Sequence, residues 1–211
     1  MYRIAENTEE IYNARKTFSS YMKELEVLLK KEYGISSQIS LVGSAKRNLV
    51  TFNGRDRSID FDYNLKICNG MDYDSFKLKN NIRSALNKVM KNHGLQDAKD
   101  STSALTVNIG EFNRIYHGKR CHIDLAIITE HNGHIHRLIH NKQHGQMTWN
   151  QMADISQLKR RENSLKEKHW LEVCNVYVAK KNLHIDEKEH HPSYNCYIEA
   201  VNEVYHKYFQ R

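Results

Sequence analysis

The chain has 211 residues, a formal net charge of +7 with its histidines neutral, and 39% apolar residues. No apolar run approaches the roughly 20 residues that a membrane helix needs, and the N-terminus lacks the basic and then apolar layout of a signal peptide. We therefore expect a cytoplasmic protein with no membrane partner. The excess of basic residues favours anionic partners such as nucleotides or RNA, although a basic surface that serves only solubility would explain the charge equally well.

Hydrophobic spacing predicts helices and strands in a mixed order. Apolar residues at helical spacing from Ile11 to Leu29 predict the first helix, and Gly34 is its expected terminator. In chain order we expect a helix over 8–32, a strand over 38–42, helical turns within 45–52, a strand over 58–67, a helix over 73–92, strands over 104–109 and 121–128, a hairpin or loop over 131–145, and helices over 155–181 and 194–209.

This order predicts an α+β fold, in which a small mixed β-sheet is backed by helices and followed by a C-terminal helical annex. The chain contains a single proline, so no Pro-rich linker separates the parts. We expect a core over residues 1–145 and a helical region over 146–211 packed against that core.

Two aspartates stand two residues apart in the strand expected over 58–67. Alternate side chains of a strand point to opposite faces, so Asp60 and Asp62 share one face while their apolar neighbours share the other. Two like charges held side by side are unfavourable unless a cation or a proton lies between them. The pattern predicts a metal site, and the alternative is an edge strand with a solvated acidic face.

Two further features fall on strands or at their ends. Gly43 and Ser44 follow the strand expected over 38–42, where a glycine lets the backbone approach a phosphate, although a plain turn is the commoner use of such a pair. Asp124 begins an otherwise apolar strand, where a carboxylate is costly to bury unless it is paired or bound to a metal. His122 shares the face of Asp124 and is either its partner or an ordinary hydrogen-bonded histidine.

Together these residues resemble the nucleotidyltransferase fold of the DNA polymerase β superfamily. That family's signature is an apolar strand ending in Gly-Ser or Gly-Gly, then Asp-x-Asp on the next strand, then a third acidic residue on a later strand. The sequence supplies LVGS at 41–44, IDFD at 59–62 and HIDL at 122–125. The most similar branch contains the 2′-5′ oligoadenylate synthetases, the bacterial cyclic-oligonucleotide synthases and the CCA-adding enzymes.

The resemblance implies a catalytic core over 1–145 and a metal-dependent reaction. Asp60, Asp62 and Asp124 would hold two Mg²⁺ or Mn²⁺ ions when an NTP is bound. Asp124 would also help to draw the proton from the attacking hydroxyl.

The resemblance also implies residues that bind the nucleotide. Gly43 and Ser44 would hold the β- and γ-phosphates, and Lys46 with its neighbour Arg47 would neutralise phosphate charge unless both are solvated at the start of a helix. A lysine from the helical region often contacts the triphosphate in this family. The candidates for that contact, with a solvated charge pair as the alternative, are Lys180 and Lys181. The candidates for stacking on a base, with core packing as the alternative, are Tyr194 and Tyr197.

The implied reaction transfers a nucleoside monophosphate from an NTP to a hydroxyl and releases pyrophosphate. The acceptor is a nucleotide, which would give an oligonucleotide or cyclic signal, an RNA end such as that of tRNA, or an antibiotic or protein side chain. The basic charge favours a nucleotide or RNA. Two alternatives stay open: a toxin–antitoxin-type nucleotidyltransferase that modifies tRNA or protein, and a non-catalytic nucleotide- or RNA-binding module with the same fold.

Other metal-ligating residue types form no recognised pattern. The four cysteines are scattered without a CxxC pair, so we expect them to be reduced packing residues rather than zinc ligands. Five histidines lie within HNGHIHRLIHNKQHG at 131–145. Without an accompanying cysteine or an HExxH pair, contact with phosphate or RNA is a better interpretation of this run than a zinc site.

Overall fold

The structure is a computed structural model that describes the whole chain except residues 6–8, 53–57, 112–119, 186–190 and 211. Its internal contacts divide the chain into two units. The first, called the sheet unit below, consists of Asn7–Val50 and Arg57–Met152. The second, called the helical unit, consists of Met1–Glu6, Thr51–Asp56 and Ala153–Arg211.

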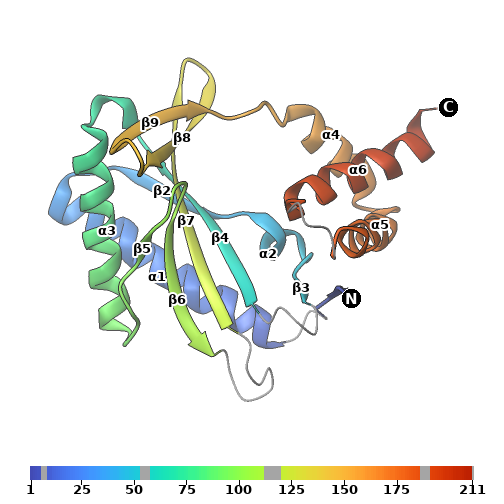
Figure 1. Cartoon of the computed structure of the whole chain (residues 1–211), viewed down its shortest axis with the longest axis horizontal. Coiled ribbons are helices and arrows are strands. Elements are labelled where there is room, and N and C mark those ends of the chain that lie inside the picture. The colour runs from blue at the N-terminus through green and yellow to red at the C-terminus, as the bar shows by residue number, and fades with distance from the viewer. Residues whose placement is uncertain (6–8, 53–57, 112–119, 186–190, 211) are drawn as a thin grey trace. The chain divides into compact units, whose positions relative to one another are not determined.

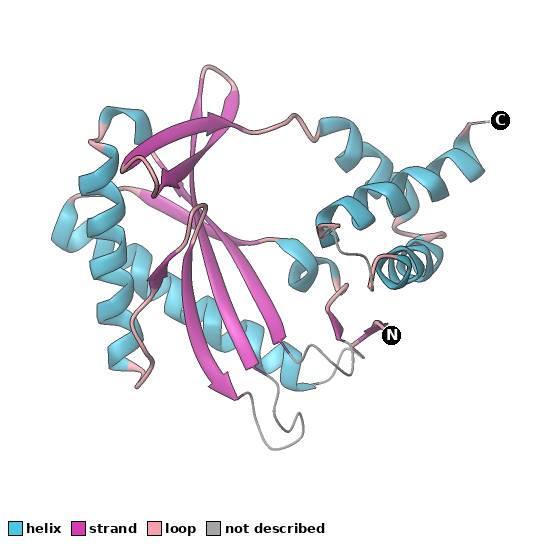
Figure 2. Cartoon of the chain, in the orientation of Figure 1, coloured by secondary structure: helices cyan, strands magenta, loops and turns pink. Residues whose placement is uncertain are grey.

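The sheet unit is a mixed α+β structure, which confirms the predicted fold class (Figures 1 and 2). Its elements in chain order are α1 (Glu9–Tyr33), β2 (Ser37–Leu41), α2 (Gly43–Arg47), β4 (Ser58–Ile67), the 3₁₀ turn η1 (Gly70–Asp72), α3 (Ser75–Asn92), β5 (Lys99–Asp100), β6 (Leu105–Glu111), β7 (Arg120–His131), β8 (His134–Asn141) and β9 (Gln146–Gln151). The strand order is β2-β4-β7-β6-β5, and β8 pairs with both β7 and β9. Only the β4–β7 pair is parallel among the pairings of this sheet in the described chain.

The alternation along β4 separates a buried face from an open one. Every second residue of the strand is at most 2% exposed: Ile59, Phe61, Tyr63, Leu65 and Ile67. On this face Phe18 of α1 packs edge-on against Phe61, with 5.0 Å between the ring centroids. The helix α1 therefore covers the apolar face of β4, and the even-numbered residues of β4 point to the opposite face.

A buried ion pair joins α3 to the short strand β5. The Lys79 side chain is 3% exposed, and its Nζ lies 2.6 Å from Asp100 Oδ1. On the other side, His140 Nδ1 of β8 lies 2.8 Å from Asp100 Oδ2. Burial alone would raise the pKa of Asp100, but the interactions with Lys79 and His140 outweigh it and hold the pKa below its ordinary value.

Replacing this carboxylate should destabilise the sheet unit. We expect Asp100→Ala to lower the free energy of unfolding by about 2 kcal/mol, because it leaves the Lys79 charge buried without its counter-ion. In a chain of this size, that loss corresponds to a fall of about 4–8 °C in Tm. The double variant Asp100→Ala/Lys79→Met should recover most of the loss in thermal denaturation. Equal losses in the single and double variants would mean that the ion pair is not the cause.

In its described residues, the helical unit has three helices and two short strands. Its elements are β1 (Arg3–Ile4), β3 (Thr51–Phe52), α4 (Ser156–Leu165), α5 (Trp170–Leu183) and α6 (Ser193–Phe209). The strands β1 and β3 pair antiparallel, and Lys181 Nζ of α5 donates to Thr51 Oγ1 over 2.6 Å. Residues from both ends of the sequence therefore belong to this unit.

Several elements differ from the sequence-based expectations. Of the two alternatives for 131–145, the hairpin is confirmed, since β8 and β9 pair antiparallel, but the hairpin extends further along the chain than expected. Residues 146–151, expected in the helical region, form β9, and the contacts divide the chain after Met152. The single helix expected over 155–181 is two helices, α4 and α5. The two-domain division of the protein stays a prediction. No helix in the described part of the chain is both long and apolar enough to cross a membrane.

Candidate active site

The pairing of β4 with β7 places the three predicted aspartates on one face of the sheet. In the parallel register, Asp62 lies beside Asp124, and Asp60 lies beside His122. Residues opposite each other on paired strands point to the same side. That side is the open face of β4, away from α1, so the structure brings Asp60, Asp62 and Asp124 together across two neighbouring strands.

The environment of Asp62 strongly perturbs its carboxyl group. Burial, followed by the nearby charges of Asp124 and Asp60, raises the pKa of Asp62 to about 6. Asp60 is more exposed, and its Oδ1 lies 3.3 Å from His122 Nδ1. His122, which the sequence leaves open as a partner of Asp124 or an ordinary hydrogen-bonded histidine, therefore lies against Asp60.

Gly43 lies against Asp62 at the start of α2. The N–H of Val42 donates to the backbone oxygen of Asp62 over 2.8 Å, which ties the beginning of α2 to β4. Gly43 has a φ of +67°, and a Cβ added at this position would lie 2.1 Å from Asp62 Oδ2. A glycine is thus required both by the backbone conformation and by the close approach to the carboxylate.

The remaining predicted nucleotide-binding residues lie on α2. Ser44 follows Gly43 in the first turn and is partly buried, whereas Lys46 is exposed. Arg47 Nη1 donates to Gly43 O over 3.0 Å, and its charge lowers the pKa of Asp62. Arg47 therefore acts on the aspartate site more directly than Lys46 does.

Two site residues were not identified from the sequence. Thr106 of β6 lies beside Asp124 in the antiparallel register, and its Oγ1 donates to Asp124 Oδ1 over 2.5 Å. Arg137 of β8 lies beside Ile128 of β7, and its charge also lowers the pKa of Asp62. The sequence signal that could have identified Thr106 is its hydroxyl side chain within the mostly apolar segment ALTVNI.

The hydrogen bond from Thr106 should orient Asp124. We expect Thr106→Val, which keeps the side-chain shape but removes the hydroxyl, to lower turnover about 10-fold with little change in Tm, since one donor to a carboxylate contributes about 1.5 kcal/mol. Thr106→Ser keeps the donor and should retain most of the turnover. Steady-state turnover is measured for both variants. Equal turnover in Thr106→Val and Thr106→Ser would mean that the Thr106 hydroxyl does not orient Asp124 for the reaction.

The candidate residues of the helical unit are engaged within that unit. Lys180 Nζ lies 2.9 Å from Glu203 Oε2. Tyr197 is 3% exposed, as expected for core packing, whereas Tyr194 is 44% exposed. The roles of these residues and of Lys181 with a nucleotide stay predictions.

The donor set on the open face fits a hard divalent cation. Carboxylate oxygens are the ligands that Mg²⁺ prefers, and a cation beside Asp62 would offset its burial and its repulsion by Asp124 and Asp60, which together raise its pKa. The ligand oxygens of the three aspartates do not form a compact set that would enclose an ion by itself. Within the described residues, a single set of three or more His, Cys, Asp or Glu has all its ligand atoms within 4.8 Å of one another, and that set lies in the helical unit. The histidines of 131–145 form no such set.

No protein-family model matches the sequence, and no curated protein matches it. Solved structures do resemble its fold. A mutant of the di-nucleotide cyclase DncV of Vibrio cholerae, in complex with ATP and GTP, has a TM-score of 0.63 at 11% identity and covers 93% of this chain and 69% of that one.

Two bacterial synthases are similar in the same way. The STING-associated CdnE c-di-GMP synthase of Capnocytophaga granulosa has a TM-score of 0.57 at 16% identity, covering 94% of this chain and 62% of that one. The CdnE cyclic dinucleotide synthase of Elizabethkingia meningoseptica, solved with GTP and Apcpp, has a TM-score of 0.57 at 14% identity, covering 91% and 70%. The chain thus spans less than two thirds of the first of these synthases. The resemblance to polymerase β-like nucleotidyltransferases is confirmed at the level of the fold, which this chain shares with cyclic dinucleotide synthases.

Proposed function

We propose that the protein is a metal-dependent nucleotidyltransferase that moves a nucleoside monophosphate from an NTP to a hydroxyl acceptor and releases pyrophosphate. The observation that carries the proposal is the side-by-side placement of Asp62 and Asp124 on the open face of the sheet, with Asp60 on the same face and Gly43 against Asp62. Burial, followed by the charges of Asp124 and Asp60, raises the pKa of Asp62 to about 6, so an ionised Asp62 is costly in this position without a cation beside it.

In the proposed reaction, the acceptor oxygen bonds to the α-phosphorus of the NTP. The bond from this phosphorus to the bridging oxygen breaks, and pyrophosphate leaves with the electron pair. Asp124, oriented by the hydrogen bond from Thr106, accepts the proton of the hydroxyl. Asp60, Asp62 and Asp124 would hold Mg²⁺ or Mn²⁺, which would supply positive charge against the phosphate oxygens.

The nucleotide phosphates are expected beside the start of α2. Gly43 and Ser44 present backbone N–H groups in the first turn, where helical N–H groups have no partner within the helix. Arg47 and Arg137 add positive charge close to Asp62, and they are better candidates for phosphate contacts than the exposed Lys46.

A second nucleotide is the acceptor that we favour. The structures with the same fold are described as cyclic dinucleotide synthases, some of them solved with ATP, GTP or their analogues. The net charge of +7 suits a reaction in which both substrates are anionic. An RNA end is the competing acceptor.

The test is an assay with radiolabelled NTPs, each alone and mixed, with Mg²⁺ or Mn²⁺, and with or without tRNA. We expect pyrophosphate and a phosphatase-resistant nucleotide product without RNA. The product should disappear in Asp62→Asn and persist in Glu130→Gln, a carboxylate variant further along β7 whose side chain pairs with Lys66. Label found only on tRNA would replace the nucleotide acceptor with RNA. Folded protein that neither binds nor turns over any NTP would overturn the proposal.

A further inference from the structure

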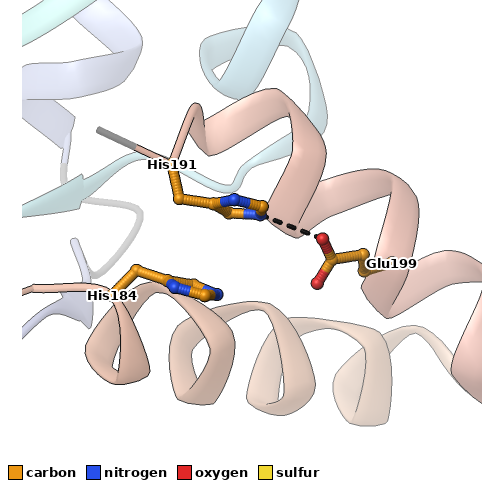
Figure 3. Close-up of side chains that lie close together, drawn as sticks. All are labelled: His184, His191 and Glu199. Carbon is orange, nitrogen blue, oxygen red and sulfur yellow. Dashed lines mark hydrogen bonds and ion pairs between the residues drawn. The ribbon is translucent and has the colours of Figure 1, made fainter. Parts of the chain in front are cut away.

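A second group of metal-ligating side chains lies in the helical unit, at the junction of α5 and α6. His184 follows the last residue of α5, His191 precedes Pro192 at the start of α6, and Glu199 lies further along α6. One ligand atom from each residue lies within 4.8 Å of the others. Figure 3 shows both imidazole rings projecting toward the Glu199 carboxylate.

The three side chains are already in contact. His191 Nε2 lies 2.9 Å from Glu199 Oε1, and the rings of His184 and His191 stack with 4.1 Å between centroids and 26° between planes. All three residues are partly buried. Their positions are therefore restricted by packing, while the group remains accessible to an ion from solvent.

The ligand chemistry of this group differs from that of the aspartate site. Two imidazole nitrogens and one carboxylate oxygen suit Zn²⁺, whereas Mg²⁺ and Ca²⁺ favour sites made entirely of oxygen. Around tetrahedral Zn²⁺, with bonds of about 2.0–2.2 Å, ligand atoms lie about 3.3 Å apart. From separations of at most 4.8 Å, the ligand atoms would need to approach one another by at most about 1.5 Å, and rotation about the side-chain torsions provides that movement.

The neighbouring lysine does not prevent binding. Lys180 Nζ lies 3.6 Å from Glu199 Oε2 but only 2.9 Å from Glu203 Oε2. Glu203 therefore remains the counter-ion of Lys180 when Glu199 contacts a cation. The Glu199 oxygen that faces His191 is the other one, Oε1.

We propose that His184, His191 and Glu199 bind one Zn²⁺ ion, with water in the fourth position. The ion replaces the proton between His191 Nε2 and Glu199 Oε1, and it links the end of α5 to the first turns of α6. This site is independent of the proposed nucleotidyltransferase reaction.

The experiment uses the full-length protein, stripped with a chelator and titrated with ZnCl₂ at neutral pH in the absence of nucleotide. Bound zinc is measured by equilibrium dialysis with elemental analysis, and Tm by circular dichroism. Wild type should bind one equivalent more than His184→Ala, His191→Ala or Glu199→Gln. Saturating zinc should raise the Tm of wild type by about 5 °C, because a ligand that binds only the folded state stabilises it. The three variants should show no such rise.

The control for non-specific binding is His206→Ala, which removes an exposed histidine from α6 outside the group. It should match wild type in both zinc content and Tm shift. Glu199→Gln keeps the size and packing of the side chain, so it tests the site even if a histidine variant fails to fold. Equal zinc content and equal Tm shifts in wild type and Glu199→Gln would overturn the proposal. Because no readout involves NTP, failure of the zinc site and failure of the proposed reaction are distinguishable.

Discussion

Replacing Asp62 by asparagine should reduce turnover by about 1,000-fold or more while the protein stays folded. The substitution keeps the side-chain shape but removes a charge from the site that is proposed to hold the metal, and metal coordination contributes several kcal/mol to stabilising the transition state. Steady-state turnover with the preferred NTP measures the loss, and circular dichroism checks the fold. The matched control is Glu130→Gln, which removes a carboxylate from β7 without touching Asp62. Undiminished turnover in Asp62→Asn would remove the carboxylate from the mechanism.

The same variant should be more stable than wild type when no metal is present. The folded-state pKa of Asp62, about 6, lies above its ordinary value of 3.8, so the folded protein binds this proton more tightly than the unfolded chain does. The wild-type free energy of unfolding should therefore fall as the pH rises from about 4 to 7. With EDTA at pH 8, we expect the asparagine variant to be more stable by about 2 kcal/mol, or about 4–8 °C in Tm.

This advantage should shrink as the pH is lowered, because protonation removes the same charge from wild type. Thermal denaturation of both proteins between pH 4 and pH 8 tests the sign directly. An advantage that stays constant over this range would mean that repulsion at Asp62 is not its source. Added Mg²⁺ should stabilise wild type more than the variant, since only wild type retains all three carboxylates.

Gly43→Ala should reduce turnover by about 100-fold or more through displacement of Asp62. The new Cβ would lie 2.1 Å from Asp62 Oδ2 if nothing moved, so the carboxylate must shift. A misplacement of about 1 Å at a reacting centre can cost 100-fold in rate. The positive φ adds a backbone strain of about 1–2 kcal/mol.

Gly34→Ala separates these two effects. Gly34 has the same φ of +67° at the end of α1, but a Cβ there would meet nothing within 4 Å. Gly34→Ala should therefore lose stability through φ strain alone and keep its turnover, whereas Gly43→Ala should lose at least as much stability in thermal denaturation and lose turnover as well. If both variants kept full activity, the close approach of Gly43 to Asp62 would have no functional importance.

Strand alternation was sufficient to place Asp60 and Asp62 on one face, but not to place other residues beside them. Alternation along β4 correctly assigned Asp60 and Asp62 to one face, because strand geometry depends only on local spacing. The placement of Asp124 beside Asp62 depends on the register between β4 and β7, which local spacing does not specify. The same holds for Thr106, whose role follows from pairing between β6 and β7.

Local sequence patterns also failed to predict some of the secondary structure. Histidines alternate with apolar residues along β8, so its strand period was obscured by a composition that indicated a loop or hairpin. The chain between α4 and α5, residues 166–169, contains neither glycine nor proline, so no local signal marked the break in the helix expected over 155–181. The His184–His191–Glu199 group required two helices to be brought together in space.

The parallel pairing of β4 with β7 also has a consequence for folding. Paired residues on these strands, such as Asp60 and His122, are 62 positions apart in the sequence, and α3, β5 and β6 lie between the strands. Bringing these two strands together loses chain entropy before the contacts between them can form. Non-local pairing of this kind therefore slows folding. During synthesis, the aspartate site can form only after β7 has left the ribosome, when most of the sheet unit is already available to pack around it.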